Sequence, residues 1–214
     1  MKMKRVFDMT IVIVAVVAVF VSCSDKHENT IANLKVAITG ETETIAIYTA
    51  FSAKATEEGY RNIANVFRAV AAAEGIHVRN HNDVLKKLGE QEYKPTAGTP
   101  TVNGTVENIQ AAIDGETHEY TVKYPSLIAT AKKEKCDAAV TSFTLAKLAE
   151  ENHERQFTEM LIILREKSDK EVPSKWFVCT QCGGIFTSPF QVCLLCKADT
   201  ERQYFIPKVF DAEL

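Results

Sequence analysis

The sequence has little of what marks several classes of protein. Its 214 residues include only 9 glycines and 6 prolines, which excludes a collagen-like or low-complexity chain. Its formal net charge of -3 leaves no basic excess of the kind that nucleic-acid binding requires. Hydrophobic residues make up 46% and charged residues 25%, as in ordinary globular proteins, so wholesale disorder is also excluded. The length allows one domain of moderate size, or one domain and a small module.

The hydrophobic run near the N-terminus is too short for a stable transmembrane helix. It covers residues 11–21 and follows three basic side chains within the first five residues. A basic start before an apolar run of this length is typical of a secretory signal peptide. The run ends in Phe20-Val-Ser-Cys23, which resembles a bacterial lipoprotein signal in which Cys23 is lipidated and becomes the mature N-terminus. We therefore expect residues 1–22 to be a signal peptide of an exported protein, periplasmic or held at the outer membrane by lipid alone; a plain anchor or a misplaced start are the alternatives.

The six cysteines are too clustered for a disulfide scaffold. Four of them form the pattern Cys-x2-Cys-x10-Cys-x2-Cys near the C-terminus, and the other two are isolated. Two Cys-x2-Cys pairs give tetrahedral sulfur ligation, which suits iron or zinc. Two disulfides are the alternative in an exported protein. The candidate metal ligands are Cys179, Cys182, Cys193 and Cys196.

Most of the remaining chain is predicted to be helical. Apolar side chains recur at helical spacing over residues 31–57, 60–88, 104–133 and 136–168. Gly59 and Gly89 follow the first two patterns and are typical helix ends. Four helices of this length indicate a bundle.

The two halves of this helical region are a duplication. Residues 33–42 match residues 108–117 at an offset of 75, whereas Tyr48 matches Tyr124 at an offset of 76. The third helix therefore contains one extra residue after Thr117. An extra residue inside a helix is readily accommodated as a π-bulge, a feature often found at functional sites.

The loop between the second and third helices constrains the topology. If a two-fold axis relates the two hairpins, these helices run parallel and the loop must travel about 42 Å, the length of about 28 helical residues. Fourteen loop residues reach about 46 Å at most, so a crossover is just long enough. An exchange of hairpins between two subunits satisfies the same constraint.

The duplication also places carboxylates and imidazoles at equivalent points of the helices. Each half supplies a glutamate after a glycine and a Glu-x-x-His pair, whose two side chains project from one helix face. Buried carboxylates in such number would repel one another without cations between them, and hard or borderline metal ions favour these donors. The set matches a di-iron or di-manganese carboxylate bundle, with four solvated helix faces as the alternative. The candidate ligands are Glu41, Glu74, His77, Glu116, Glu119, Glu150 and His153, with Tyr48 and Tyr124 as either hydrogen-bonding partners of the ligand carboxylates or plain core residues.

Together these motifs resemble the rubrerythrin family, in which a ferritin-like di-iron bundle is fused to a rubredoxin-like domain. The resemblance runs from about Asn33 to Phe205 and implies a mainly α protein, with a four-helix bundle over 31–168 and a small metal-binding β domain over 174–214. It implies that the carboxylates and His153 hold two irons, and that His77 exchanges with Glu119 on one iron as the oxidation state changes.

The resemblance also implies an activity, the reduction of hydrogen peroxide to water in oxidative-stress defence. Electrons from an unidentified donor would pass through an iron held by the four cysteines, commonly across a head-to-tail homodimer. Thr180 and Leu194 stand where rubredoxin-like knuckles have proline, and Lys197 stands where they have a second glycine, so zinc is the alternative to iron in the four-cysteine site. Iron storage and peroxide or oxygen sensing are the rival functions on the same scaffold.

Overall fold

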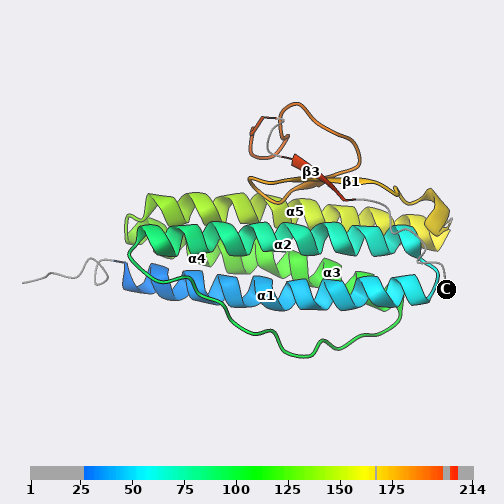
Figure 1. Ribbon diagram of the computed structural model, residues 1–214, viewed down its shortest axis with the longest axis horizontal. Coiled ribbons are helices and arrows are strands. Elements are labelled where there is room, and N and C mark those ends of the chain that lie inside the picture. Colours follow the sequence, from blue (N-terminus) through cyan, green and yellow to red (C-terminus); the bar gives the residue numbers. More distant parts are fainter. Residues whose placement is uncertain (1–26, 167, 200–202, 207–214) are drawn as a thin grey trace, which may run out of the picture.

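The long helices lie side by side in an elongated bundle (Figure 1). The computed structural model describes residues 27–166, 168–199 and 203–206. Within these residues the α-helices are α1 (Glu28–Glu57), α2 (Arg61–Lys87), α3 (Thr105–His118), α4 (Tyr124–Lys133) and α5 (Asp137–Glu166). Because α3 and α4 continue one another through a π-helical segment, the bundle has four rods. The predicted mainly α, ferritin-like bundle is confirmed, with helix ends within a few residues of those expected.

The chain crosses the length of the bundle between its two halves. α1 and α2 form one antiparallel hairpin, and α3–α4 with α5 form the other (Figure 1). The connection from Leu88 to Gly104 has no regular structure and runs along the outside of the bundle, so that α2 and α3 point the same way. The connection is therefore a crossover within the chain, which is one of the two arrangements that the loop length allowed.

The π-helix, η2 (Glu119–Lys123), lies where the repeat has its extra residue. The five residues of this segment separate α3 from α4, and the helical backbone is continuous through them. The sequence prediction of a π-bulge after Thr117 is therefore confirmed. Its consequence is that Tyr124 is fully buried, while Glu119 and Lys123 both lie half-buried at the edge of the bundle interior.

Each hairpin caps the first helix of the other hairpin. The carboxylate of Glu58, after α1, accepts a hydrogen bond from the backbone N–H of Thr105 in α3 (2.9 Å). The carboxylate of Glu134, after α4, accepts one from the backbone N–H of Thr30 in α1 (2.9 Å). These pairs satisfy N–H groups that a helix N-terminus otherwise leaves without a partner. They also show that the duplication seen in the sequence is a pseudo-two-fold relation in space.

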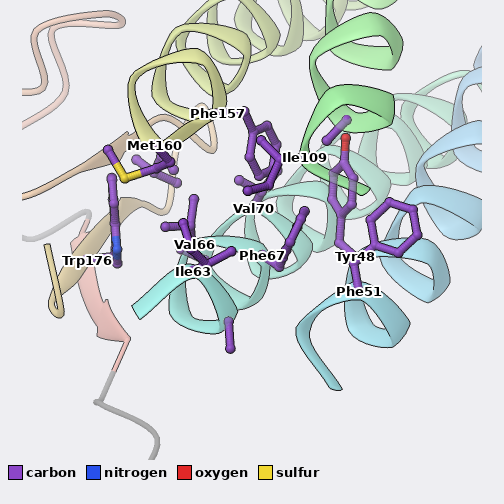
Figure 2. Close-up of a cluster of buried hydrophobic side chains, with 14 of the residues drawn as sticks. Tyr48, Phe51, Ile63, Val66, Phe67, Val70, Ile109, Phe157, Met160 and Trp176 are labelled. Atoms are coloured by element: carbon purple, nitrogen blue, oxygen red, sulfur yellow. The ribbon is translucent and has the colours of Figure 1, made fainter. Parts of the chain in front are cut away.

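Two apolar clusters fill the bundle on either side of a polar layer. One contains Leu34, Ile38 and Phe143, and the other contains Phe67 and Phe157. Figure 2 shows Tyr48, Phe67 and Phe157 in the second cluster; adjacent rings there have centroids 5.3–5.8 Å apart. Since the candidate ligands fall between these apolar stretches in every helix, they are enclosed on both sides.

The C-terminal module is a small antiparallel sheet packed on α2 and α5. Its strands are β1 (Trp176–Cys179), β2 (Ile185–Phe186) and β3 (Gln203–Ile206), in the order β2-β1-β3. Trp176 is fully buried in the same apolar cluster as Phe67, beside Met160 in Figure 2. The module and the bundle therefore share one continuous core.

The expected signal peptide and Cys23 lie outside the described residues. Within those residues no helix is long and apolar enough to cross a membrane.

Candidate metal centres

The bundle brings six of the seven candidate carboxylate and histidine ligands together at its centre. Their side chains form two groups in which the donor atoms of all members lie within 4.8 Å of one another. The groups share Glu74 and Glu150, which is the arrangement of two metal sites joined by bridging carboxylates. The first group is Glu41, Glu74, His77 and Glu150, and the second is Glu74, Glu116, Glu150 and His153.

Both imidazoles turn one nitrogen toward this cluster. Nδ1 of His77 lies 2.7 Å from Oε2 of Glu74 and 3.1 Å from Oε1 of Glu150. Nδ1 of His153 lies 2.9 Å from Oε2 of Glu150. The pair follows from the duplicated Glu-x-x-His motif, because residues three apart share a helix face.

The donor atoms fit a site for cations. Within the described residues, Oε1 of Glu74, both carboxylate oxygens of Glu150 and Nδ1 of His153 are buried and form no well-aligned hydrogen bond, although they lie within ion-pair distance of other atoms of the cluster. Buried polar atoms are ordinarily paired, and a carboxylate left unpaired in an apolar interior is costly. Oxygen and imidazole donors converging from four helices suit a pair of iron or manganese ions. The residues therefore fit the expected di-iron centre.

In the metal-free protein, protons take over part of the charge balance. Burial raises the pKa of Glu41 to about 8, although Lys123 opposes the rise, and burial also raises the pKa of Glu116 well above its usual range. Burial would lower the pKa of His77 and His153, but the carboxylates of Glu150 and Glu74 outweigh it and raise both. Metal binding must therefore displace protons from this cluster.

Two buried tyrosines hold the terminal carboxylates in a reciprocal way. The hydroxyl of Tyr48 donates to Oε1 of Glu116, and the hydroxyl of Tyr124 donates to Oε1 of Glu41, each at 2.5 Å. Each tyrosine thus contacts the glutamate of the opposite half. Hydrogen bonds of this kind orient the ligands of metal sites and tune the metal.

Glu119 lies beside the cluster but belongs to neither four-residue group. Its carboxylate pairs with Lys123, whose Nζ lies 2.8 Å from Oε2. The same ammonium lies 3.3 Å from Oε1 of Glu41. The structure therefore places His77 within the cluster and Glu119 just outside it.

Lys123 and His81 are two polar residues of the site that the sequence reasoning missed. His81 is fully buried one turn after His77, and its ring nitrogens contact Ser142 Oγ (2.8 Å) and Tyr124 OH (3.1 Å). Burial lowers the pKa of His81 well below its usual range, so the ring is neutral. The signal in the sequence was spacing alone, since His81 is four residues from His77 and Lys123 is four residues from Glu119.

The four C-terminal cysteines converge in the second metal site. Sγ of Cys179 lies 3.6 Å from Sγ of Cys196, and Sγ of Cys182 lies 3.8 Å from Sγ of Cys193. Ligands at about 2.3 Å from a tetrahedral metal are about 3.8 Å apart, so the spacing fits an iron or zinc ion. All four are free thiols rather than the two disulfides that the sequence left open.

The two knuckles have the same backbone turn with different residues at its key position. The backbone N–H of Gly183 donates to the carbonyl of Cys179 (2.8 Å), and that of Lys197 donates to the carbonyl of Cys193 (2.9 Å). Both residues have positive φ, 85° for Gly183 and 62° for Lys197. Lysine here adopts a conformation that glycine adopts without steric cost.

The first knuckle lies directly against the histidines of the bundle. Nε2 of His77 donates to the carbonyl of Cys182 (2.9 Å), and Nε2 of His153 donates to the carbonyl of Gly183 (3.1 Å). These bonds fix the tautomer of both rings and leave each Nδ1 free for a metal. The resemblance implied such contact across a homodimer, whereas here the module lies on the bundle of its own chain. The homodimer itself stays a prediction.

The fold and the two donor sets define a class, a ferritin-like di-iron protein with a four-cysteine module. Sequence comparison agrees, since the Rubrerythrin family model matches residues 32–161, and the chain belongs to the rubrerythrin family. It is 36% identical to nigerythrin of Nitratidesulfovibrio vulgaris, over 78% of this chain and 82% of that protein. It is 31% identical to rubrerythrin of Porphyromonas gingivalis, over 86% of this chain and 92% of that one.

Solved structures give the same assignment. A mixed-valent nigerythrin structure superposes with a TM-score of 0.75 at 34% identity, covering 82% of this chain and 86% of that one. A bacterioferritin of Desulfovibrio desulfuricans has a TM-score of 0.64 at 17% identity, which shows a shared fold alone. The chain is thus a di-iron oxidative-stress protein, of a family whose members generally reduce peroxide with electrons from a donor.

Proposed function

We propose that this protein reduces hydrogen peroxide to water at the bundle centre, with electrons delivered through the four-cysteine site. The observation that carries the proposal is the hydrogen bond from His77 to the carbonyl of Cys182. It joins a candidate ligand of one metal centre directly to a candidate ligand residue of the other. A short covalent and hydrogen-bonded path of this kind suits the transfer of electrons between them.

The residues at the bundle centre have two kinds of role in this proposal, as metal ligands and as hydrogen-bonding partners of those ligands. Glu74 and Glu150, which belong to both groups, would hold both metals, Glu41 with His77 and Glu116 with His153 would complete the two sites, and the tyrosines hold the terminal carboxylates. When bound, a ferrous pair supplies the two electrons that the O–O bond of peroxide requires. The apolar clusters enclose this layer of ligands on two sides.

Glu119 and His77 support the proposed ligand exchange. The structure has His77 inside the cluster and Glu119 held outside it by Lys123, which is one of the two arrangements that an exchange requires. We infer that Glu119 replaces His77 on one metal in the other oxidation state. His77 would then remain hydrogen-bonded to Cys182 through Nε2.

The docked four-cysteine module favours a redox enzyme over iron storage. Storage of iron needs no second metal centre in contact with the ligands of the first. Here the module shares the core of the bundle and hydrogen-bonds to both of its histidines. We propose further that this enzyme works outside the cytoplasm, on the strength of the signal-like residues 1–22 and Cys23.

The test is a titration of the purified mature protein, loaded with iron and reduced without oxygen. We expect three irons per chain, and reoxidation of the di-iron pair by one equivalent of hydrogen peroxide, with water as the product. Optical spectra should show the cysteine-bound iron reoxidised once further peroxide is added. A reduced, iron-loaded protein that stays reduced under excess peroxide would overturn the proposal.

A further inference from the structure

A cavity much larger than hydrogen peroxide leads to the carboxylate cluster. It has a volume of about 460 Å³ and lies between α1, α3 and the crossover loop. Its inner end is formed by Glu41, Glu74, Glu116 and Glu119. A water molecule occupies about 30 Å³ in the liquid, whereas sites for small organic ligands measure about 300–1,000 Å³. The space thus matches an organic molecule rather than hydrogen peroxide alone.

The lining of the cavity changes in character along its length. Away from the carboxylates it is formed by apolar groups, among them Ile47, Phe51, Pro100 and Ala112. The exposed carboxylate of Glu43 adds negative charge to the wall. A ligand that fits has an uncharged polar end at the cluster and an apolar body behind it. Anions are disfavoured because every charged side chain that lines the cavity is acidic.

The pseudo-two-fold relation explains why this space is open. Lys123 in the second half corresponds to Ile47 in the first, and Gly40 corresponds to Gly115. At Gly40 the space is filled, since a Cβ added there would lie 2.6 Å from Nζ of Lys123. At Gly115, which lines the cavity, an added Cβ would meet nothing within 4 Å. The replacement of lysine by isoleucine therefore leaves an apolar cavity in the first half.

The cavity and the four-cysteine module lie on opposite sides of the cluster. The module covers α2 and α5, whereas the cavity is walled by α1, α3 and the crossover loop, on the far side of the bundle in Figure 1. A bulky substrate in the cavity leaves the contacts of His77 and His153 with the module in place. Substrate and electrons thus reach the centre from different directions.

We propose that this cavity binds uncharged alkyl or aryl hydroperoxides and presents their O–O bond to the di-metal centre. This inference rests on the proposed peroxidase function and names a wider class of substrate for it. Reduction of ROOH breaks the O–O bond, consumes two electrons from the ferrous pair and two protons from solvent, and releases ROH and water. The apolar R group occupies the space beside Ile47 and Phe51.

The first experiment compares two oxidants on the reduced, iron-loaded full chain. Stopped-flow spectroscopy measures reoxidation by cumene hydroperoxide and by hydrogen peroxide. Calorimetry measures binding of cumyl alcohol, the redox-inert product, to the same protein. We expect both peroxides to reoxidise the centre, with cumyl alcohol and water as the products from cumene hydroperoxide, and we expect cumyl alcohol to bind.

The second experiment fills the cavity and uses a matched control. Gly115→Leu places a side chain into the open space next to Glu116. Gly75→Leu makes the same change at another exposed helical glycine next to a candidate ligand, outside the cavity lining, where an added Cβ also meets nothing within 4 Å. We expect G115L to lower the ratio of the cumene hydroperoxide rate to the hydrogen peroxide rate at least tenfold and to weaken cumyl alcohol binding, while G75L keeps both near the wild-type values.

The outcomes separate this inference from the proposed function. If hydrogen peroxide reoxidises the protein but cumene hydroperoxide does not, or if cumyl alcohol fails to bind, the inference is wrong and the peroxidase proposal stands. If G115L and G75L change the rate ratio equally, the cavity is not the binding site. If neither peroxide reacts, the peroxidase proposal fails and takes the inference with it.

Discussion

Lys123 brings an ammonium group to the carboxylates at the edge of the bundle centre. Its side chain is 14% exposed, and its Nζ lies within 3.3 Å of oxygens from both Glu41 and Glu119. In the metal-free protein this ammonium balances charge that the metal ions balance in the loaded protein. The contribution of Lys123 to stability should therefore depend on metal.

We predict that Lys123→Met destabilises the metal-free protein by about 2 kcal/mol and the metal-loaded protein much less. Removing one partner of a buried pair costs about 3–5 kcal/mol, and the partial exposure of Glu119 reduces that figure. Urea unfolding of both forms measures the difference. Lys147→Met is the control, because Lys147 lies over the ring of Tyr120 rather than at the cluster. Equal losses in the two forms would show that the charge of Lys123 is unrelated to the metal site.

Lys197 occupies a backbone conformation that suits glycine better. Its φ of 62° lies in the left-handed region, which costs a residue with a side chain about 1–2 kcal/mol. We predict that Lys197→Gly stabilises the four-cysteine module by about 1 kcal/mol and slows loss of its metal to a chelator. Lys135→Gly relieves a similar φ of 56° outside the module, and it should leave the chelation rate unchanged. A faster loss of metal in K197G would mean that the hydrogen bond from Lys197 to Leu194 outweighs the strain.

At the scale of the helix, much of the architecture was predictable because it is periodic. Apolar spacing located the rods, and the change of offset from 75 to 76 located the π-helix. The positions of His81 and Lys123 were harder to predict, since a lone residue four places from a ligand is common on solvated faces. The docking of Gly183 on His77 was beyond the sequence, because the motifs of the two modules carry no information about how they pack.

The N-terminus of α1 depends on a carboxylate from the opposite hairpin. Although burial opposes it, hydrogen bonds from Thr30 and Asn29 lower the pKa of Glu134 from 4.5 to about 2. A lowered pKa in the folded state stabilises the protein above pH 4.5, and this stabilisation disappears as the pH falls toward 2.

We predict that Glu134→Gln costs the metal-free protein about 0.5–1 kcal/mol at pH 7, a small value because Glu134 is largely solvated. The difference in unfolding free energy between wild type and variant should shrink as the pH falls from 4.5 to 2. Urea unfolding at a series of pH values measures it. Glu58→Gln removes the equivalent cap of α3, where hydrogen bonds from Thr105 also lower the pKa of the carboxyl, and should change stability in the same direction. Glu151→Gln, on an exposed face of α5, is the control. If the difference in unfolding free energy between wild type and Glu134→Gln stays constant with pH, the Glu134 carboxylate does not stabilise α1 through its charge.

At the scale of the whole molecule, the proposed electron transfer between the two metal centres requires that the module stays docked. Gly183 is the closest point of contact, since a Cβ added there would lie 2.6 Å from Nε2 of His77 and 3.2 Å from the carbonyl oxygen of Ala73. We predict that Gly183→Ala slows electron transfer from the cysteine-bound iron to the di-iron centre at least tenfold, because the knuckle must move away from α2. Rapid-mixing spectroscopy of the reduced protein with peroxide resolves the two centres. Gly75→Ala on α2 is the control, and an unchanged rate in G183A would place the electron path elsewhere.

The last prediction concerns where this pair of centres operates. The signal-like residues 1–22 and Cys23 lead us to expect a mature chain that begins at Cys23 and carries lipid. In cells that express the full chain, the protein should enter the membrane fraction, incorporate a labelled fatty acid and have the mass of a chain that starts at residue 23. Cys23→Ser should abolish labelling and processing, whereas Cys136→Ser, a buried thiol at the start of α5, should alter neither. An unlabelled protein that retains residue 1 would contradict lipidation and leave a plain anchor or a misplaced start, whereas a labelled protein requires an electron donor outside the inner membrane.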